Sequence, residues 1–328
     1  MRGRAAAWSD PKVQDLASRF VPVADEVGYL QTAKGPECDL FRKIAEQGHY
    51  AGRTKPTATR QGIYAATTDG TLLASINTAD PAAMAEMLEK ALAKWDELPD
   101  EARAPETELD ADRAHASRAE SRFPRTGISL VEYTRDLPHE GGPDDWRKDS
   151  WNIDHVWLTR KEARGFFPLE RTVGSRRVVP EHLARRMAMF HLVDFAYGQT
   201  SCYSPSDVEK ASLSSEVTAV EGETVRVRIE GAFRTVARGR WPVNSREPVG
   251  EQERGFEGTL VGHATYDFAE DRLIAIELVV VGNRWGGTQY NCRHDGLEPS
   301  PVGFVLRLED DEAARVPPQF IWSDYWAR

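Results

Sequence analysis

Hydrophobic residues in the first hundred positions recur mostly at helical spacing. After Asp10-Pro11, a typical helix-capping pair, apolar residues follow at intervals of three and four as far as Phe20. A second helix is predicted to begin at Pro36. A third is predicted over residues 80–98, where apolar side chains recur from Met84 with a period of about 3.6 residues. The pattern therefore predicts three amphipathic helices.

Strand-like patterns lie between these helices. Residues 20–24 predict a short strand, and the apolar runs at 63–68 and 71–76 predict two more. Asp69-Gly70 separates the last two runs, and this dipeptide between apolar runs strongly favours a β-hairpin. Residues 1–99 are therefore predicted to form an α/β domain.

From residue 126 onward strand patterns dominate. Residues 224–230 alternate strictly between apolar and polar, which predicts one buried face and one face in water. A strand at 128–133 precedes a predicted helix that begins at Pro180 and carries Leu183 and Met187 on one face. The other predicted strands are residues 213–220, 223–233, 256–268, 273–282 and 302–308. Short turns between successive strands predict an α+β domain built on an antiparallel meander or partial barrel, with the helix on its inner face.

The stretch between these regions has a different composition. Ala, Glu, Asp and Arg dominate residues 99–125, and prolines bracket them. We interpret residues 100–125 as a charged linker between a domain at 1–99 and a domain at 126–328. A solvated helix packed on the first domain is the alternative interpretation.

Composition narrows the range of partners. The chain of 328 residues is 40% hydrophobic and 29% charged, which is typical of a globular protein. Its 42 basic and 52 acidic residues give a net charge of -10, which disfavours nucleic acid as the main partner. No apolar run approaches the roughly 18 residues of a membrane helix, and the N-terminus has no signal-peptide pattern. We therefore expect a soluble, cytoplasmic protein without a membrane partner.

Three segments of the first domain carry a resemblance to thioredoxin-like proteins. They are Trp8–Val13 leading through a helix to Phe20–Val23, the hairpin segment Gly62–Leu73, and the helix at 80–98. The resemblance covers just under a third of the chain. It implies a central mixed sheet in the order strand, helix, strand, helix, hairpin, helix.

The sequence departs from that family at both halves of the redox site. Thioredoxin-like enzymes carry Cys-x-x-Cys at the start of the first helix, where the helix N-terminus lowers the thiol pKa. Arg4–Trp8 contains no cysteine, and Gln61-Gly62 stands where the family places a cis-proline. The resemblance thus implies a thioredoxin-like domain without dithiol chemistry. The first helix also begins close to Met1, so either the first strand is missing or the coding sequence starts further upstream.

The second domain is similar to C-terminal regions of uncharacterised bacterial proteins in which such a region follows a thioredoxin-like domain. Residues 254–267 and 280–286 carry this similarity. It implies no particular activity and no cofactor.

The three cysteines, Cys38, Cys202 and Cys292, are too few for a disulfide-dense scaffold or a four-cysteine zinc site. Cys38 lies near a predicted helix N-terminus, where the helix dipole favours a thiolate while Glu37 and Asp39 oppose it. Its two interpretations are a single-cysteine redox site and an inert packing thiol.

Histidines provide further candidates. Cys292 and His294 lie in one predicted loop and, together with His263, offer a metal-ligand set, although their spacing matches no established zinc pattern. Asp154-His155 and His191 with Asp194 offer acid–base pairs, the second at i, i+3 on one helical face. The alternative for these pairs is a hydrogen-bonded structural role.

Asn283, Arg284 and Trp285 form the most prominent aromatic and basic cluster, in a predicted loop. This cluster can line the mouth of a ligand pocket in the second domain through stacking or cation–π contact. The alternative is a hairpin tip with a packed tryptophan.

Three functional hypotheses follow. The first is a non-catalytic binding or scaffold protein for a protein or small-molecule partner, because the dithiol is missing and no recognised catalytic motif is found. The second is a thiol–disulfide or peroxide redox protein that uses Cys38 alone, or a Cys-x-x-Cys pair encoded upstream of Met1. The third is a metal-binding protein or metal-assisted hydrolase around His263, Cys292 and His294. We adopt the first, which predicts neither enzymatic activity nor a cofactor.

Overall fold

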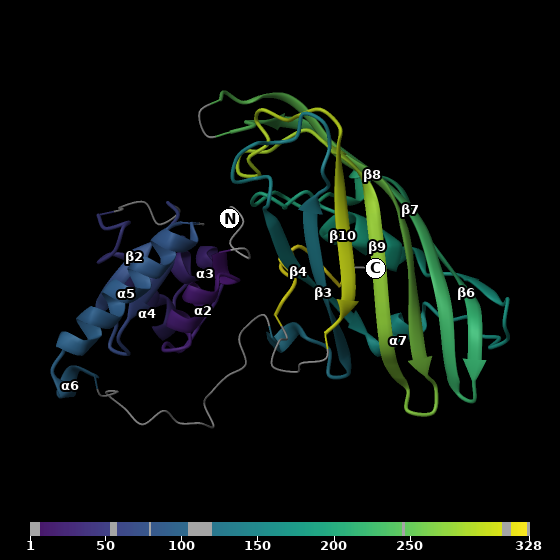
Figure 1. Ribbon diagram of the computed structural model, residues 1–328, viewed down its shortest axis with the longest axis horizontal. Coiled ribbons are helices and arrows are strands. Elements are labelled where there is room, and N and C mark those ends of the chain that lie inside the picture. Colours follow the sequence, from purple (N-terminus) through teal and green to yellow (C-terminus); the bar gives the residue numbers. More distant parts are fainter. Residues whose placement is uncertain are drawn as a thin grey trace. The chain divides into compact units, whose positions relative to one another are not determined.

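The computed structural model describes residues 7–52, 58–78, 80–103, 120–244, 247–309 and 316–326. The chain divides into two compact units, residues 4–117 and 118–328, which are drawn in Figure 1. The division falls in the segment for which the sequence predicts a linker, although residues 104–119 of that segment lie outside the described residues. No helix in the described ranges is long and apolar enough to cross a membrane.

The first unit is mainly helical. Its helices are α2 (Pro11–Ala17), α3 (Val27–Thr32), α4 (Pro36–Ala45), α5 (Pro81–Glu97) and α6 (Asp100–Arg103). The Asp10 carboxylate accepts the backbone N–H of Lys12 and Val13 and caps α2, while Asp80 accepts the N–H of Ala82 and caps α5. These caps explain why both helices begin at the predicted acid–proline pairs.

The predicted hairpin of the first unit is confirmed. Strand β1 (Ile63–Ala66) pairs antiparallel with β2 (Leu72–Ile76), and Gly70 between them adopts a positive φ of 83°. The apolar face of α5 joins the hairpin in one buried core, to which Met84 and Leu88 contribute.

The predicted strand at 20–24 is wrong. Residues 21–26 have no regular secondary structure, and the Val21 and Val23 side chains are each 88% exposed. A strand needs a neighbour to pair its backbone groups, and the only sheet among the described residues of this unit is the β1–β2 hairpin. The larger mixed sheet implied by the thioredoxin-like resemblance is not seen in the described residues, and that resemblance stays a prediction.

The second unit contains one antiparallel sheet of eight strands. The strands are β3 (Gly127–Asp136), β4 (Trp151–Thr159), β5 (Arg176–Val178), β6 (Val208–Glu221), β7 (Thr224–Trp241), β8 (Gly250–Asp267), β9 (Arg272–Trp285) and β10 (Ser300–Leu308). Their order across the sheet is β4-β3-β10-β9-β8-β7-β6-β5. The predicted meander is therefore confirmed for β6 to β10, and β4 and β5 form the two edges.

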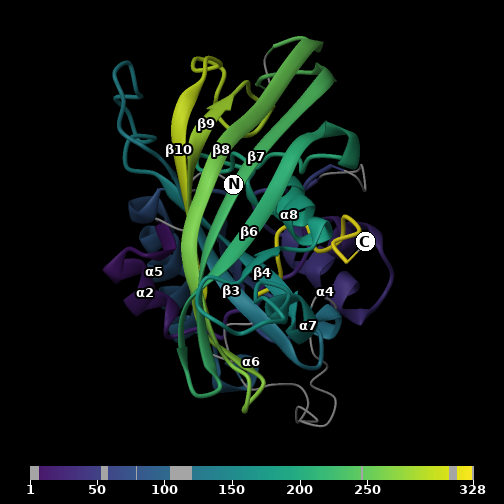
Figure 2. The same ribbon diagram turned by 90° about the vertical axis from the view of Figure 1, so that its right-hand side faces the viewer.

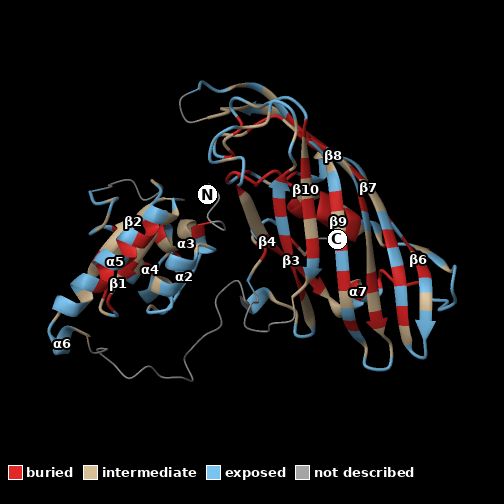
Figure 3. Ribbon diagram, in the orientation of Figure 1, coloured by how far each residue is buried: buried red, intermediate tan, exposed pale blue. Residues whose placement is uncertain are grey.

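Short helices lie on one face of this sheet. They are α7 (Arg160–Arg164), α8 (Glu181–Arg186) and the π-helical turn η3 (Met187–His191), with 3-10 turns η2 (Glu120–Arg122) and η4 (Pro205–Asp207). Figure 2 shows the long strands bending around the side on which α7 and α8 lie. The alternating burial along the strands (Figure 3) marks their inner face.

The core of the second unit lies between α8 and the inner face of the sheet. Leu183 and Met187 belong to the same buried cluster as Val227, Phe256 and Val280 from three strands. The prediction of a covering helix that begins after Pro180 is confirmed. The sequence pattern did not predict that its last turn is a π-helix, closed by a hydrogen bond from Leu192 N–H to the Met187 carbonyl.

Candidate functional site

A pocket of about 900 Å³ lies in the second unit between α7, α8 and the turn that joins β8 to β9. Helix α7 follows directly on β4. Its start is fixed by a capping box, in which the Thr159 hydroxyl accepts the Glu162 N–H and the Glu162 carboxylate accepts the Thr159 N–H. Phe268 and Asp271 of the turn complete the wall together with five residues after α7, which are Gly165, Phe167, Pro168, Leu169 and Arg171.

Cationic side chains dominate the wall of this pocket. Two carboxylates, Glu162 and Asp271, line it together with the cations Arg122, Arg160, Lys161, Arg164, Arg171, Arg177 and Arg186. The pocket thus carries a surplus of positive charge in a chain whose net charge is -10.

Both carboxylates are shared between cations. Asp271 lies 3.3 Å from Arg160 and 3.4 Å from Arg164, and Glu162 lies 2.9 Å from Arg186. A hydrogen bond from the Tyr266 hydroxyl and these two arginines hold the pKa of Asp271 below its usual value. The carboxylates are therefore charged and still leave cations unmatched.

Some cations in the wall, among them Lys161 and Arg177, have no acidic partner among the described residues. Arg177 donates to the backbone carbonyl of Phe167 at 3.0 Å, and Lys161 forms no ion pair there. Arg171 lies over the Phe268 ring, with its guanidinium carbon 3.9 Å from the ring centroid. At its edge, Arg171 donates a hydrogen bond of 2.8 Å to the Glu223 carboxylate, so part of its charge is already paired.

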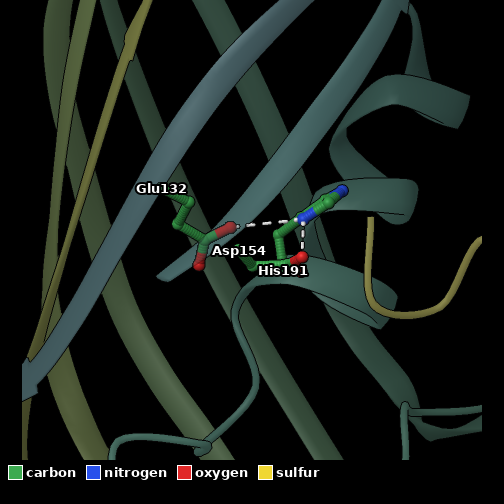
Figure 4. Close-up of side chains that lie close together, drawn as sticks. All are labelled: Glu132, Asp154 and His191. Carbon is green, nitrogen blue, oxygen red and sulfur yellow. Dashed lines mark ion pairs between the residues drawn. The ribbon is translucent and has the colours of Figure 1, made fainter. Parts of the chain in front are cut away.

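A second polar cluster lies inside the core of the same unit. Glu132 on β3 stands directly opposite Asp154 on β4, and His191 is the last residue of η3. Figure 4 shows these three side chains turned toward one another. The exposed fractions of the Glu132, Asp154 and His191 side chains are 0%, 4% and 0%, so the cluster is closed to the surrounding solvent.

The contacts within this cluster are close but lack hydrogen-bond geometry. Nδ1 of His191 lies 3.2 Å from Oε2 of Glu132 and 3.6 Å from Oδ2 of Asp154, and none of these atoms has a hydrogen-bond partner. Oε1 of Glu132 is also buried without one. Burial raises the pKa of Glu132 to about 7, because the charged form loses its hydration.

The opposite side of the imidazole is well bonded. Nε2 of His191 lies 2.9 Å from the Tyr325 hydroxyl, which accepts the Trp157 N–H at 3.0 Å and lies 3.3 Å from the Trp157 carbonyl. If the hydroxyl proton goes to that carbonyl, Nε2 carries a proton and donates it to the hydroxyl. In the neutral imidazole, the lone pair of Nδ1 then faces the two carboxylates.

A buried ion network lies elsewhere in the unit. Arg293 is 2% exposed and donates two hydrogen bonds of 2.6 Å to Asp136, with further bonds of 2.6 and 2.8 Å to Asp194. Its guanidinium carbon lies 3.8 Å from the Tyr197 ring centroid. Burial opposes the charged form of Asp136, but the bonds from Arg293 outweigh it and lower the pKa of this carboxyl. This network ties the segment after β9 to β3.

The candidate metal ligands His263, Cys292 and His294 are not brought together. His263 lies within β8 opposite Glu277, whereas Cys292 and His294 follow the end of β9 at Trp285. Trp285 pairs with Gly255, which lies eight residues from His263 along β8, roughly 26 Å at the usual rise per residue. In the described ranges, only Glu132, Asp154 and His191 form a group of metal-binding residue types with donor atoms within 4.8 Å of one another.

The cluster of Asn283, Arg284 and Trp285 lies within β9, so the predicted loop is wrong. Arg284 is buried and donates to the Gly296 carbonyl at 2.5 Å, while Trp285 donates its indole N–H to Glu253 at 3.0 Å. None of the three lines the pocket beside α7. Arg284 is therefore buried within the sheet, Trp285 is half-buried, and Asn283 is exposed.

Cys38 lies in α4 with its side chain fully buried, and its Sγ lies 3.8 Å from the Tyr29 carbonyl. This surrounding fits the interpretation as a packing thiol, since a reactive thiol needs both access and a partner that stabilises the thiolate.

The histidine and aspartate residues of the predicted acid–base pairs have other partners in the structure. His191 faces Asp154 rather than Asp194, and Asp194 bonds to Arg293. Sequence reasoning missed Glu132, although a charged residue in the apolar run Ile128–Tyr133 was a usable signal. The pocket arginines gave no such signal, because they are scattered between residues 122 and 186 without a fixed period.

Comparisons of the chain with protein-family models, with curated proteins and with solved structures found no match. Two arrangements in the second unit can carry chemistry. The pocket beside α7 can hold an anion against several guanidinium groups. The enclosed cluster of Glu132, Asp154 and His191 can hold a cation.

Proposed function

We propose that this chain is a binding protein whose second unit takes a small organic anion in the pocket beside α7. The observation that carries the proposal is the lining of seven cationic side chains against two carboxylates. In a chain with a net charge of -10, a concave basic wall raises the local concentration of ligands of opposite charge.

The lining also indicates the chemical class of the ligand. Guanidinium groups match carboxylate, phosphate and sulfonate oxygens through paired hydrogen bonds. Phe167, Pro168 and Phe268 add apolar surface next to them. A volume of about 900 Å³ suits a small organic molecule. The ligand is therefore an anion with an apolar or aromatic portion.

The residues of the same pocket wall favour binding over catalysis. The residues that line the pocket include no cysteine or serine, and the Thr159 hydroxyl is engaged in the cap of α7. His182 lies 3.7 Å from Glu162, which Arg186 already neutralises. This arrangement supports recognition of charge more than activation of a nucleophile.

For the first unit we propose a thioredoxin-like scaffold without redox chemistry. Helix α4, the β1–β2 hairpin and α5 follow one another in the order that the resemblance implies. The burial of Cys38 favours this role over a single-cysteine redox site.

The test uses two fluorescent probes that differ in one charge. Anilinonaphthalene sulfonate and uncharged anilinonaphthalene have the same rings, and only the first carries an anion. We expect the full chain to bind the sulfonate saturably and the uncharged probe at least about tenfold more weakly, since one charge-assisted contact is worth about 1.5–3 kcal/mol. Inorganic phosphate should compete with the sulfonate.

Matched double variants locate the site. Lys161→Gln with Arg177→Gln removes two cations without an acidic partner among the described residues, and Arg226→Gln with Arg228→Gln removes two from the outer face of β7. The first pair should weaken sulfonate binding about tenfold or more, and the second should leave it unchanged. Equal affinity for both probes, or equal loss in both double variants, would refute the pocket as the anion site.

A further inference from the structure

We propose that Glu132, Asp154 and His191 bind a divalent transition-metal ion within the core of the second unit. One imidazole nitrogen and two carboxylates form a ligand set of the kind that Zn²⁺, Mn²⁺ and Fe²⁺ accept. The proposal concerns the enclosed cluster and is independent of the anion pocket.

The spacing of the donor atoms fits a metal at their centre. Metal–ligand bonds of about 2.1 Å at tetrahedral angles place neighbouring donor atoms about 3.4 Å apart. Nδ1 of His191 lies 3.2 Å from Oε2 of Glu132 and 3.6 Å from Oδ2 of Asp154. The three side chains come from β3, β4 and η3, so they approach this point from different elements (Figure 4).

Unsatisfied buried atoms supply an independent reason for a cation. Both carboxylate oxygens of Glu132, Oδ2 of Asp154 and Nδ1 of His191 are buried without a hydrogen-bond partner. Buried polar atoms are almost always bonded, and a carboxylate without a partner is among the most costly groups to bury. One ion between these atoms satisfies all four, and with Glu132 bound through both oxygens the protein alone supplies four donor atoms.

A proton shared between His191 and a carboxylate explains the geometry of the cluster less well than a metal ion does. Burial opposes a charged His191, but Tyr325 and the two carboxylates outweigh it and raise the pKa of His191, so the metal-free cluster holds a proton. An imidazolium would direct its Nδ1–H at one of the carboxylates, but neither contact has hydrogen-bond geometry. The atoms of the ligand side chains that face away from the cluster are instead held in place. The Gln319 N–H donates to Oδ1 of Asp154 at 2.8 Å, and the Tyr325 hydroxyl lies 2.9 Å from Nε2 of His191. Such outer bonds orient the ligands of protein metal sites.

The metal has a structural role in this position. Because all three side chains are at most 4% exposed, a substrate has no access to the ion. The ion joins neighbouring strands to the π-helical turn, so its binding adds to the stability of the folded unit.

The first experiment measures metal content and stability of the full chain. The protein is unfolded in denaturant with a chelator and refolded with Zn²⁺, Mn²⁺ or Co²⁺, or without metal. We expect close to one ion per chain after removal of free metal, and a melting temperature about 5–10 °C above that of the metal-free protein. The Co²⁺ form should show the visible absorption bands of a four-coordinate site.

Two variants assign the site. Glu132→Gln keeps the shape of the side chain but removes one ligand charge, and we expect metal content to fall at least tenfold. Glu277→Gln changes a sheet carboxylate that also stands opposite a histidine, His263, and should retain the metal. Retention of the metal in Glu132→Gln, or its loss in both variants, would contradict the assignment.

The wild-type chain decides the question if Glu132→Gln does not fold. A Co²⁺ spectrum equal to that of the hydrated ion would overturn the proposal. So would refolded protein that holds less than about one ion per ten chains with each of the three metals and melts at an unchanged temperature. In that case the cluster is a buried ion pair that shares a proton.

Discussion

The Tyr325 hydroxyl lies 2.9 Å from Nε2 of His191, although 134 residues separate the two in sequence. The same hydroxyl accepts the backbone N–H of Trp157 in the edge strand β4. One side chain of the C-terminal segment therefore joins η3 to the edge of the large sheet.

Removal of this hydroxyl leaves the buried Trp157 N–H without an acceptor and Nε2 of His191 without its hydrogen-bond partner. We expect Tyr325→Phe to lower the free energy of unfolding of the second unit by about 1–3 kcal/mol, the usual cost of unsatisfied buried donors. Urea denaturation followed by near-ultraviolet circular dichroism measures this change. Tyr290→Phe is the control, because Tyr290 is 59% exposed, and it should change stability by less than about 0.5 kcal/mol. Similar losses in both variants would argue against a special role for Tyr325.

The buried Arg293 network should be sensitive to loss of its cation. Arg293→Met keeps an apolar stem of similar length but takes from Asp136 and Asp194 the cation that is hydrogen-bonded to both, and leaves Arg284, 4.0 Å from Asp194, as a weaker counter-charge. We expect a loss of about 3–5 kcal/mol in the free energy of unfolding. Arg228→Met, which breaks the exposed pair with Glu230, should cost less than about 1 kcal/mol. Urea unfolding of the two variants tests this difference, provided that the free energy of unfolding depends equally steeply on urea concentration in both.

The same network predicts acid sensitivity. Arg293 holds the pKa of Asp136 below its usual value despite burial, so the folded chain binds this proton less readily than the unfolded chain, where the pKa is about 3.9. Its stabilising contribution is complete above that unfolded value and is lost as the pH falls through the lowered folded value. Urea midpoints measured between about pH 6 and pH 2 should fall below about pH 4. The fall should be shallower in Arg293→Met, and an equal slope in both proteins would exclude Asp136 as its source.

The three cysteines should differ in reactivity. Cys38 is buried, whereas Cys202 and Cys292 are partly exposed. Under native conditions we expect a thiol reagent to label Cys202 and Cys292. Cys38 should react at least about tenfold more slowly, because its thiol becomes accessible only when the chain unfolds. Peptide mass spectrometry after timed labelling separates the three sites. Preferential labelling of Cys38 near neutral pH would instead favour the redox hypothesis.

Much of the fold was predictable because the spacing of apolar residues within one segment shows which of its faces is buried. The alternation at 224–230 predicted β7, and Asp69-Gly70 predicted the β1–β2 hairpin. The same reasoning failed at Val21 and Val23, which resemble a strand but have no neighbour to pair with. Local patterns describe which face of a segment is apolar, whereas pairing depends on segments far along the chain.

The candidate sites were less predictable for the same reason. His191 and Asp154 were each candidates, but with other partners, because the π-helical turn η3 and the register of β3 with β4 decide which side chains meet. Neither feature leaves a clear mark in the sequence. The basic pocket depends on bringing α7 to the β8–β9 turn, and only the folded chain places Asp271 beside Arg160 and Arg164.

The two outermost strands, β4 and β5, are the places where the sheet can meet another copy of the chain. An edge strand with free backbone groups can pair with a neighbouring molecule and start a polymer. At one edge, β5 is only three residues long and begins with Arg176 and Arg177. At the other edge, the C-terminal segment contacts β4 through Tyr325 and Gln319. This segment therefore occupies part of the β4 edge, and we expect a protein that lost it to expose a nine-residue edge strand to pairing with other copies of the chain.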